Sequence, residues 1–135
     1  MITYRDTAEG ISANSLRGFF VDWPHPPSPT AHLAILRGSD CVALALEAEQ
    51  VVGFVTALSD GVLYACVSLL EVLPEYRRQG IGSELMRRVL GALSDLYAVD
   101  VQCDPELQPF YQRLGLRPAF GMMLRKYDYQ GGRSR

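Results

Sequence analysis

The sequence has few of the residues that metal centres, disulfide frameworks and covalent amine chemistry require. It contains three cysteines, Cys41, Cys66 and Cys103, two histidines and a single lysine, Lys126. The cysteines lie far apart and form no C-x-x-C pair, which argues against a disulfide framework and against structural zinc. Neither histidine has metal-ligand spacing, so no metal site is expected. With one lysine near the C-terminus, Schiff-base catalysis is disfavoured.

Long apolar runs and an excess of one charge are also missing. No apolar stretch approaches the ~18 residues of a membrane span, and the first ten residues lack the basic and apolar regions of a signal peptide. A formal net charge of −2 provides no general basic field for nucleic acid or anionic lipid. We therefore expect a cytoplasmic protein that binds neither nucleic acid nor membranes.

The composition that remains is that of an ordinary folded domain. The 135 residues are 48% hydrophobic and 21% charged, and a chain of this length buries roughly two-thirds of its unfolded surface. No repeat, linker or low-complexity segment divides the sequence. We expect a single domain over residues 1–128 and a flexible C-terminal tail over residues 129–135.

Hydrophobic periodicity predicts a mixed α/β domain. Residues 61–73 are nearly continuously apolar, which is typical of a strand covered on both faces. Pro109 should kink or restart the last helix, and the proline-rich residues 21–30 should form a stiff loop. Strands are expected at 2–5, 41–48, 51–60, 61–73, 97–103 and 120–129, with 41–60 as an antiparallel hairpin, and helices at 11–20, 30–38, 83–93 and 105–115.

The segment EVLPEYRRQGIGSELM, residues 71–86, places two arginines and two glycines at the start of a helix. Glycine permits positive φ and close ligand approach, and the first N–H groups of a helix have no partner within it. Together with the helix dipole and the forked guanidinium groups of Arg77 and Arg78, these amides predict a diphosphate site.

Two common phosphate motifs do not match this segment. A Walker loop requires G-x-x-x-x-G-K-[ST], but the segment lacks both the first glycine and the lysine. The dinucleotide fingerprint G-x-G-x-x-G requires glycine at position 85, where Leu85 stands. Acidic charge and the missing lysine also disfavour a nucleotide- or nucleic-acid-binding domain.

The pattern R/Q-x-x-G-x-G/A does match, at Arg77, Gly80 and Gly82. Downstream, PFYQRLG matches F-Y-x-x-x-G, with Phe110 and Tyr111. These motifs resemble those of the GCN5-related N-acetyltransferases (the GNAT superfamily), and the resemblance covers residues 62–126. It implies the GNAT fold: a mostly antiparallel, twisted sheet, splayed between its fourth and fifth strands, with helices on both faces.

The resemblance implies acetyl-CoA as cosubstrate. Amides of the arginine–glycine loop (residues 77–83) bind the pyrophosphate in the family, and the end of the preceding strand pairs with the pantetheine arm. Many relatives carry N-x-x-A-x-x-F-Y, whose asparagine contacts CoA; this chain has Asp104 and Leu107 at those two positions, and an ionised Asp104 could accept but not donate a hydrogen bond. The implied cofactor-binding residues are Leu70, Glu71, Val72, Arg77, Arg78, Gln79, Gly80, Ile81, Gly82, Ser83, Asp104 and Tyr111.

Tyr111 matches the family tyrosine that protonates the leaving thiolate; a phenol of pKa ~10 is a suitable acid for a thiolate of ~8.5. Glu71, at the strand end, is the candidate general base, with ion pairing to Arg77 or Arg78 as the equal alternative. A water chain could also serve. Side-chain rivals for the base are Asp60, Asp22 and His25.

The resemblance implies an N-acetyltransferase that transfers acetyl directly to a primary amine, with a small molecule favoured as acceptor. Trp23 and His25 in the proline-rich loop are candidate acceptor-site residues, with a rigid surface connector as the alternative. Other functions left open are a non-catalytic acyl-CoA-binding module and a protein N-terminal or lysine acetyltransferase. Because dimers are common in the family, a homodimer is also left open.

Overall fold

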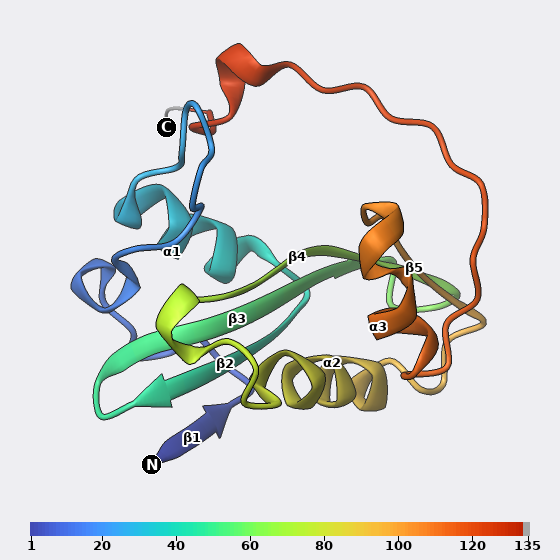
Figure 1. Cartoon of the computed structure of the whole chain (residues 1–135), viewed down its shortest axis with the longest axis horizontal. Helices are drawn as coiled ribbons and strands as arrows, with labels where there is room; N and C mark the ends of the chain where they lie inside the picture. Colours follow the sequence, from blue (N-terminus) through green and yellow to red (C-terminus); the bar gives the residue numbers. More distant parts are fainter. Residues whose placement is uncertain (134–135) are drawn as a thin grey trace.

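A five-stranded sheet, in the order β1-β2-β3-β4-β5, forms the centre of the computed structural model, which describes residues 1–133 (Figure 1). The first three pairings are antiparallel, whereas β4 and β5 are parallel. The predicted mixed α/β class with a mostly antiparallel sheet is confirmed. The strands are β1 (Ile2–Arg5), β2 (Cys41–Glu47), β3 (Gln50–Ser59), β4 (Tyr64–Val72) and β5 (Ala98–Val101).

The sheet opens between its last two strands. β5 follows β4 only as far as the pair Val67 and Val101, but β4 continues to Val72. The edge of β4 that faces β5 therefore has no strand partner over residues 68–72 in the described part of the chain. This divergence confirms the splay predicted between the fourth and fifth strands.

Helices cover both faces of the sheet. Side chains of neighbouring strand residues point to opposite faces, and Gly53 and Phe54 show the two environments. Gly53 lies under α2 (Ile81–Ala92): a Cβ placed on it would come within 3.1 Å of Leu85 and 3.2 Å of Ile81. Phe54 packs on the other face, which α1 (Pro29–Gly38) and the 3₁₀ helix η1 (Ala13–Leu16) cover.

Local sequence signals explain where the two long helices begin. Ser28 caps α1, since its hydroxyl oxygen accepts a hydrogen bond from the Ala31 N–H at 3.1 Å, and Pro29 fits the first turn. α2 begins directly after Gly80, two residues earlier than predicted, and buries Ile81, Leu85, Met86 and Val89 along one side.

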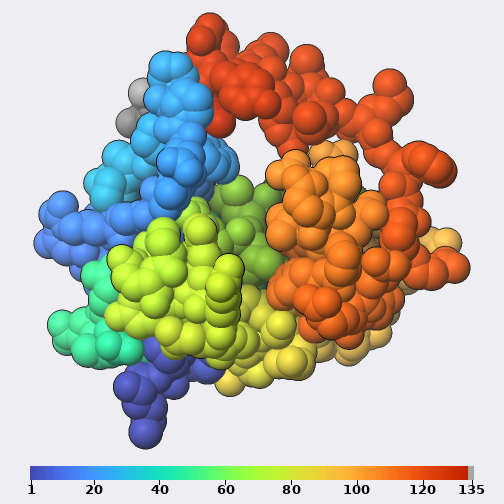
Figure 2. All heavy atoms as spheres, in the orientation of Figure 1, coloured from blue at the N-terminus to red at the C-terminus, as the bar shows by residue number. Residues whose placement is uncertain are grey.

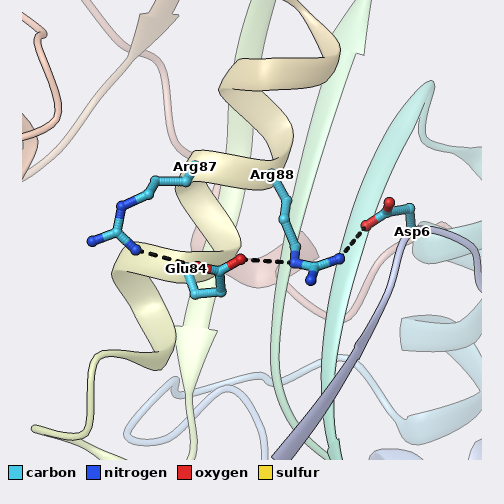
Figure 3. Close-up of polar contacts among 4 residues, drawn as sticks. All are labelled: Asp6, Glu84, Arg87 and Arg88. Carbon is cyan, nitrogen blue, oxygen red and sulfur yellow. Dashed lines mark hydrogen bonds and ion pairs between the residues drawn. The ribbon is translucent and has the colours of Figure 1, made fainter.

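The outer side of α2 carries an ion-pair chain (Figure 3). Glu84 pairs with Arg87 at 3.3 Å and with Arg88 at 3.0 Å, and Arg88 reaches Asp6 just after β1 at 3.4 Å. The Arg88 guanidinium also lies over the Tyr4 ring, 4.8 Å from its centroid. Solvent-exposed ion pairs contribute only about 0–1 kcal/mol of stability each. These ion pairs therefore orient α2 against β1 more than they stabilise the domain.

Two sequence predictions for the first half of the chain are wrong. The helix expected at residues 11–20 is only the 3₁₀ turn of η1, because Gly18 has φ +93° and Phe20 has φ 62°, both outside the right-handed helical region. The strand expected at 61–73 is shorter and not covered on both faces. Ser68 is exposed and residues 69–72 are half-buried, since β5 has already diverged there.

For the region after β5, the sequence prediction is correct in one respect and wrong in another. Pro109 does restart the helix, which splits into the 3₁₀ turn η3 (Pro105–Leu107) and α3 (Gln108–Gln112). The strand expected at 120–129 is absent: residues 117–126 are extended without a strand partner and lead to a 3₁₀ turn, η4 (Tyr127–Tyr129). We call residues 117–130 the C-terminal arm.

The expected flexible tail, residues 129–135, lies partly outside the described residues, which end at 133. Within them, Gln130 is held: its side-chain oxygen accepts a hydrogen bond from the His25 N–H at 3.3 Å. None of the helices described between residues 1 and 133 has the length and apolarity needed to cross a membrane.

One titratable group is buried inside the domain. His32 on α1 is 1% exposed and packs among Phe19, Phe20 and Phe54 at ring-centroid distances of 4.3 to 5.3 Å. Neither of its ring nitrogens has a hydrogen-bond partner in the described structure. Burial lowers the pKa of His32 from 6.5 to about 4, because a charged imidazolium would lose its hydration there.

This burial predicts a pH-dependent stability. The unfolded chain protonates His32 near pH 6.5, whereas the folded protein does so only near pH 4, so stability falls as pH drops through that window. Between pH 7 and 5, His32 should remove about 2 kcal/mol from the free energy of unfolding, and His32→Leu should remove that part of the slope. Urea denaturation at both pH values measures it. His25→Ala, at an exposed histidine, is the control and should keep the full slope.

Candidate functional site

A cleft of about 540 Å³ lies where β4 and β5 separate. Its walls are the end of β4, the loop that follows, the start of α2, and α3. In Figure 2 the yellow-green segment after β4 and the orange segment of α3 stand on opposite sides of this region. The lining residues are Leu70, Glu71, Val72, Tyr76, Arg77, Arg78, Gly80, Ile81, Gly82, Ser83, Leu107, Phe110, Tyr111 and Arg113.

The start of α2 presents unpaired backbone amides to the cleft. The first hydrogen bond of the helix runs from the Glu84 N–H to the Gly80 carbonyl at 3.1 Å. The N–H groups of Ile81, Gly82 and Ser83 therefore precede the helical bonding pattern, and no side chain caps them. Gly80 has φ +81°, which glycine adopts without steric cost. This end of α2 is suited to bind an anion.

Three arginines add positive charge around these amides. Arg77, Arg78 and Arg113 line the cleft, are exposed, and form no ion pair with any described residue. Arg77 is oriented by the end of the preceding strand, β4, because its Nε donates to the Val72 carbonyl oxygen at 3.1 Å. With no carboxylate neutralising them, the guanidinium groups of Arg78 and Arg113 are available for an anionic ligand.

The end of β4 supplies a second kind of contact. Leu70 and Val72 line the cleft, and beyond Val67 the edge of β4 is not covered by β5. An extended polar chain could hydrogen-bond there in the manner of an added strand. The Val72 carbonyl is the exception, since it already accepts from Arg77.

Tyr111 places a phenol at the α3 side of the cleft. Its side chain is buried, with the whole residue 8% exposed, and its hydroxyl makes no hydrogen bond with another described residue. Burial raises the pKa of Tyr111 above 10, and the nearby Cys103 thiol raises it further. The phenol is therefore protonated at neutral pH and can donate a proton. Phe110, 4.9 Å away between ring centroids, packs beside the start of α2 at Gly82.

Glu71 lies at the cleft but is engaged with the N-terminal loop. Because it is paired with Phe54 across the sheet, its side chain lies on the face opposite α2. Its two carboxylate oxygens accept hydrogen bonds from the Phe20 N–H at 2.8 Å and the Val21 N–H at 3.3 Å. Phe20 has φ 62°, an unfavourable conformation for an aromatic residue, and the carboxylate helps to hold it. The alternative ion pair with Arg77 or Arg78 is wrong, since neither arginine pairs with Glu71.

Four predicted site residues are not among those that line the cleft. Asp104 and Gln79 are exposed and are not among the residues that line the cleft. Trp23 packs on Phe20 with 4.8 Å between ring centroids, and the His25 backbone N–H donates to the Gln130 side chain. Neither residue is among those that line the cleft. The loop that carries Trp23 and His25 is nevertheless joined to the cleft, because the Phe20 N–H in that loop donates a hydrogen bond to Glu71, which lines the cleft.

The rival bases are not at the cleft either. Asp60 caps the turn before β4: its carboxylate accepts from the backbone N–H groups of Leu63, Val62 and Tyr64, and these bonds lower its pKa. Asp22 is exposed in the loop after Phe20 and is absent from the cleft lining.

Sequence reasoning missed four residues that line the cleft: Tyr76, Leu107, Phe110 and Arg113. Phe110 and Arg113 had a readable signal. They lie three positions apart on the segment that carries Tyr111, and residues at that spacing share one face of a helix. Tyr76 and Leu107 have no periodic signal, because each ends a 3₁₀ turn.

Comparisons with known proteins agree with this geometry. The sequence of a chloroplastic GCN5-related N-acetyltransferase 3 from Arabidopsis thaliana is 37% identical over 68 residues, which are 49% of this chain and 29% of that protein. The second comparison is with the crystal structure of a protein from Deinococcus radiodurans R1 whose acetyltransferase function is itself inferred. The two structures have a TM-score of 0.97 and 50% sequence identity, and the match covers 99% of this chain and 94% of that one.

A third similarity is to the fold alone. The structure of AAC(6')-Iy, in complex with the bisubstrate analogue CoA-S-monomethyl-acetylneamine, has a TM-score of 0.67 at 22% identity, covering 93% of this chain and 97% of that one. The chain spans less than a third of the length of its Arabidopsis relative. The sequence model of the acetyltransferase (GNAT) family matches residues 9–116. The chain belongs to the acetyltransferase (GNAT) family.

Proposed function

We propose that the protein transfers the acetyl group of acetyl-CoA to a primary amine. The observation that carries this proposal is the meeting, in one cleft, of the unpaired amides at the start of α2, the open edge of β4 and the Tyr111 phenol. These three features suit, in order, a pyrophosphate, the amide-bearing pantetheine arm and a thioester sulfur. The structure of AAC(6')-Iy, which shares the fold, is a complex with the bisubstrate analogue CoA-S-monomethyl-acetylneamine.

The residues present fit coenzyme A part by part. Ile81, Gly82 and Ser83 would hold the two phosphates through their N–H groups, and Arg78 would add charge. The backbone of Leu70 would pair with the pantetheine arm along the open edge of β4. That path leads past the strand end toward Tyr111, which lines the same cleft.

The reaction in this arrangement is a direct transfer. The free amine attacks the thioester carbonyl carbon, the carbon–sulfur bond breaks, and the sulfur takes the proton of the Tyr111 hydroxyl while the amine gives its own proton to a base or water. Holding both reactants in place accounts for much of the rate acceleration. A protonated phenol beside the departing thiolate supplies the acid.

We place the acceptor on the face of β4 opposite α2, where Glu71 holds residues 20 and 21. Glu71 is the positioning residue of this side, because its carboxylate joins the loop that carries Trp23 to the strand that lines the cleft. A small amine is the favoured acceptor. Release of free thiol from acetyl-CoA across a panel of small amines and lysine peptides tests both the activity and this preference; no thiol release with any amine would contradict the proposal.

Gly82→Ala should separate folding from cofactor binding. A Cβ at position 82 would make only ordinary contacts with Phe110, at 3.6 Å, and would gain about 0.5–1 kcal/mol of helix propensity, so the variant should fold with an equal or higher Tm. The added methyl group would occupy the path by which phosphate reaches the amides, so affinity for CoA should fall by about tenfold or more.

Calorimetric titration with CoA and a thermal melt measure these two effects. Gly91→Ala is the matched control, since Gly91 lies in the same helix with nothing within 4 Å of its Cβ position. It should show the gain in Tm with unchanged CoA affinity. If Gly82→Ala binds CoA with wild-type affinity, the phosphates do not bind at the start of α2.

Tyr111→Phe should lower kcat by about a hundredfold or more, the usual scale of a lost general acid, with CoA affinity retained. The phenyl ring keeps the buried packing of Tyr111, so folding should be unaffected. Tyr97→Phe, at a tyrosine 84% exposed, is the control and should leave both quantities unchanged. Full turnover by Tyr111→Phe would remove the acid role.

Glu71→Gln should mainly affect the acceptor. Glutamine offers one accepting oxygen where the carboxylate offers two, so one of the bonds to Phe20 and Val21 is lost and the loop is released. We expect a several-fold higher KM for the amine with CoA affinity unchanged, measured by steady-state kinetics. If KM stays constant and kcat loses its acidic limb in a pH profile, Glu71 is instead the general base.

A further inference from the structure

His32 is a buried polar side chain whose polar atoms the fold does not use. It is 1% exposed, and neither ring nitrogen has a hydrogen-bond partner among the described residues. A neutral imidazole always has one N–H to donate and one nitrogen that accepts, and buried polar groups without partners are rare in folded proteins. An apolar side chain of similar volume would fill the same space without leaving two nitrogens unbonded. Packing alone therefore does not explain the imidazole.

One aromatic ring separates His32 from the carboxylate of Glu71. The Phe20 ring packs against the imidazole, with 4.9 Å between centroids, and the Phe20 N–H donates to Glu71 at 2.8 Å. The Phe54 ring also contacts the imidazole, at 4.3 Å, and Phe54 is paired with Glu71 across the sheet. Both routes lead to the face of β4 to which we assign the acceptor. His32 therefore lies next to that side of the cleft, with the rings of Phe20 and Phe54 between them.

The segment that carries Phe20 is held in a strained conformation. Phe20 has φ 62° and Asp22 has φ 67°, left-handed values that non-glycine residues rarely adopt, and Gly18 just before them has φ +93°. Such conformations persist only where the surroundings hold them, and they occur often at switch regions. On the side of β4 the hold consists of hydrogen bonds from the Phe20 and Val21 N–H groups to one carboxylate, that of Glu71. Loss of those bonds would let the segment relax and move the Phe20 ring.

An amine acceptor would compete for that carboxylate. At neutral pH a primary amine is mainly an ammonium ion, and its contact with a carboxylate is charged on both sides, whereas each backbone N–H is neutral. A ligand shifts a conformational equilibrium only by binding one state better than the other. The ammonium ion gains the whole Glu71 carboxylate only when residues 20 and 21 release it. The acceptor would therefore favour the state in which the Phe20 ring has moved.

We propose that His32 is the base that takes a proton from the acceptor amine, and that the Phe20 segment is the gate that admits the amine to it. The inference rests on the proposed function, because it names the base of that reaction. It also explains why an imidazole with two unbonded nitrogens is buried beside the acceptor side of the cleft.

The protons of the reaction balance with this assignment. His32 takes one proton from the ammonium ion and becomes an imidazolium, which frees the nitrogen lone pair to attack the thioester carbonyl carbon. As the carbon–sulfur bond breaks, the sulfur takes the Tyr111 proton and the nitrogen loses its second proton to water. Tyr111 then regains a proton from water, and the imidazolium gives its proton to solvent. The ammonium ion and acetyl-CoA thus give the amide, the free CoA thiol and one H⁺.

The elements packed around His32 carry few charges. α1 has Arg37 besides it, β3 has no titratable side chain, and η1 and the segment that follows it contribute Arg17 and Asp22; all three of these residues are exposed. β4 contributes Glu71. Burial alone therefore lowers the pKa of His32 to about 4 in the closed arrangement. Contact with water after opening should return its pKa toward 6.5, which suits a base at neutral pH.

The titration of His32 tests the gate without any acceptor. The chain has two histidines, so two ring C–H signals in proton NMR report their pKa values. In the wild type the pKa of His32 should be about 4, and Glu71→Ala, which removes both hydrogen bonds to the Phe20 segment, should raise it toward 6.5. Asp22→Asn removes a carboxylate from the same segment without touching those bonds, and should leave the pKa of His32 unchanged. If Glu71→Ala does not move the pKa of His32, the gate is overturned.

Turnover tests the base. His32→Leu keeps an apolar side chain of similar volume in the aromatic cluster, so it should fold and bind CoA as the wild type does. Its kcat should be about a hundredfold lower, the scale of a lost general base. Phe19→Leu changes the packing against the same imidazole without removing a base, and should keep kcat within a few-fold of the wild type. A wild-type kcat in His32→Leu overturns the base role.

Chemical rescue separates proton transfer from packing. In His32→Ala, added imidazole should restore part of kcat, whereas pyrazole, a ring of the same shape but a much weaker base, should not. Rescue by both compounds, or by neither, shows that the imidazole only fills space. A wild type that releases no thiol with any amine ends the base role together with the proposed reaction, while the NMR titration still decides whether the Phe20 segment opens.

Discussion

The early end of pairing between β4 and β5 is the constraint on which the site depends. Four residue pairs, from Tyr64 with Ala98 to Val67 with Val101, hold the two strands together, and β4 then continues alone to Val72. If β5 paired with β4 over the whole length of β4, there would be no room for a cleft at that end of the sheet. Because it is not, the end of β4, the start of α2 and α3 enclose a cleft instead of a continuous sheet face.

The two faces of β4 supply different chemistry to that cleft. On the α2 side, backbone amides and arginines offer positive charge without a neutralising carboxylate. On the other side, Glu71 is paired across the sheet with Phe54, at the edge of the aromatic group that buries His32, and holds the Phe20 backbone. One strand end therefore separates the half that carries the amides and arginines from the half to which we assign the acceptor. Alternation along a single strand is sufficient to divide the two roles.

Most of the fold could be predicted from the sequence, and so could the glycines and arginines that stand at the start of α2 and line the cleft. The hairpin β2–β3, the helices α1 and α2 and the glycines on either side of Ile81 have strong local signals: alternating apolar residues, caps and backbone freedom. The partners of Glu71 could not be predicted, since they depend on a loop 50 residues earlier whose Phe20 has positive φ. The strand at 120–129 was predicted from β-propensity, but a strand also needs a neighbour, and local sequence does not report one.

Gly53 determines how closely α2 packs on the sheet. It lies on β3, and a side chain there would meet Ile81 and Leu85 at 3.1 to 3.2 Å, closer than most carbon contacts in proteins. The bare backbone lets the first turn of α2 rest directly on the sheet. A methyl group at this position would force the side chains of Ile81 and Leu85, and the turn that carries them, to give way. The distance of the start of α2 from the sheet is thus set by a residue on the strand below it that is not among those lining the cleft.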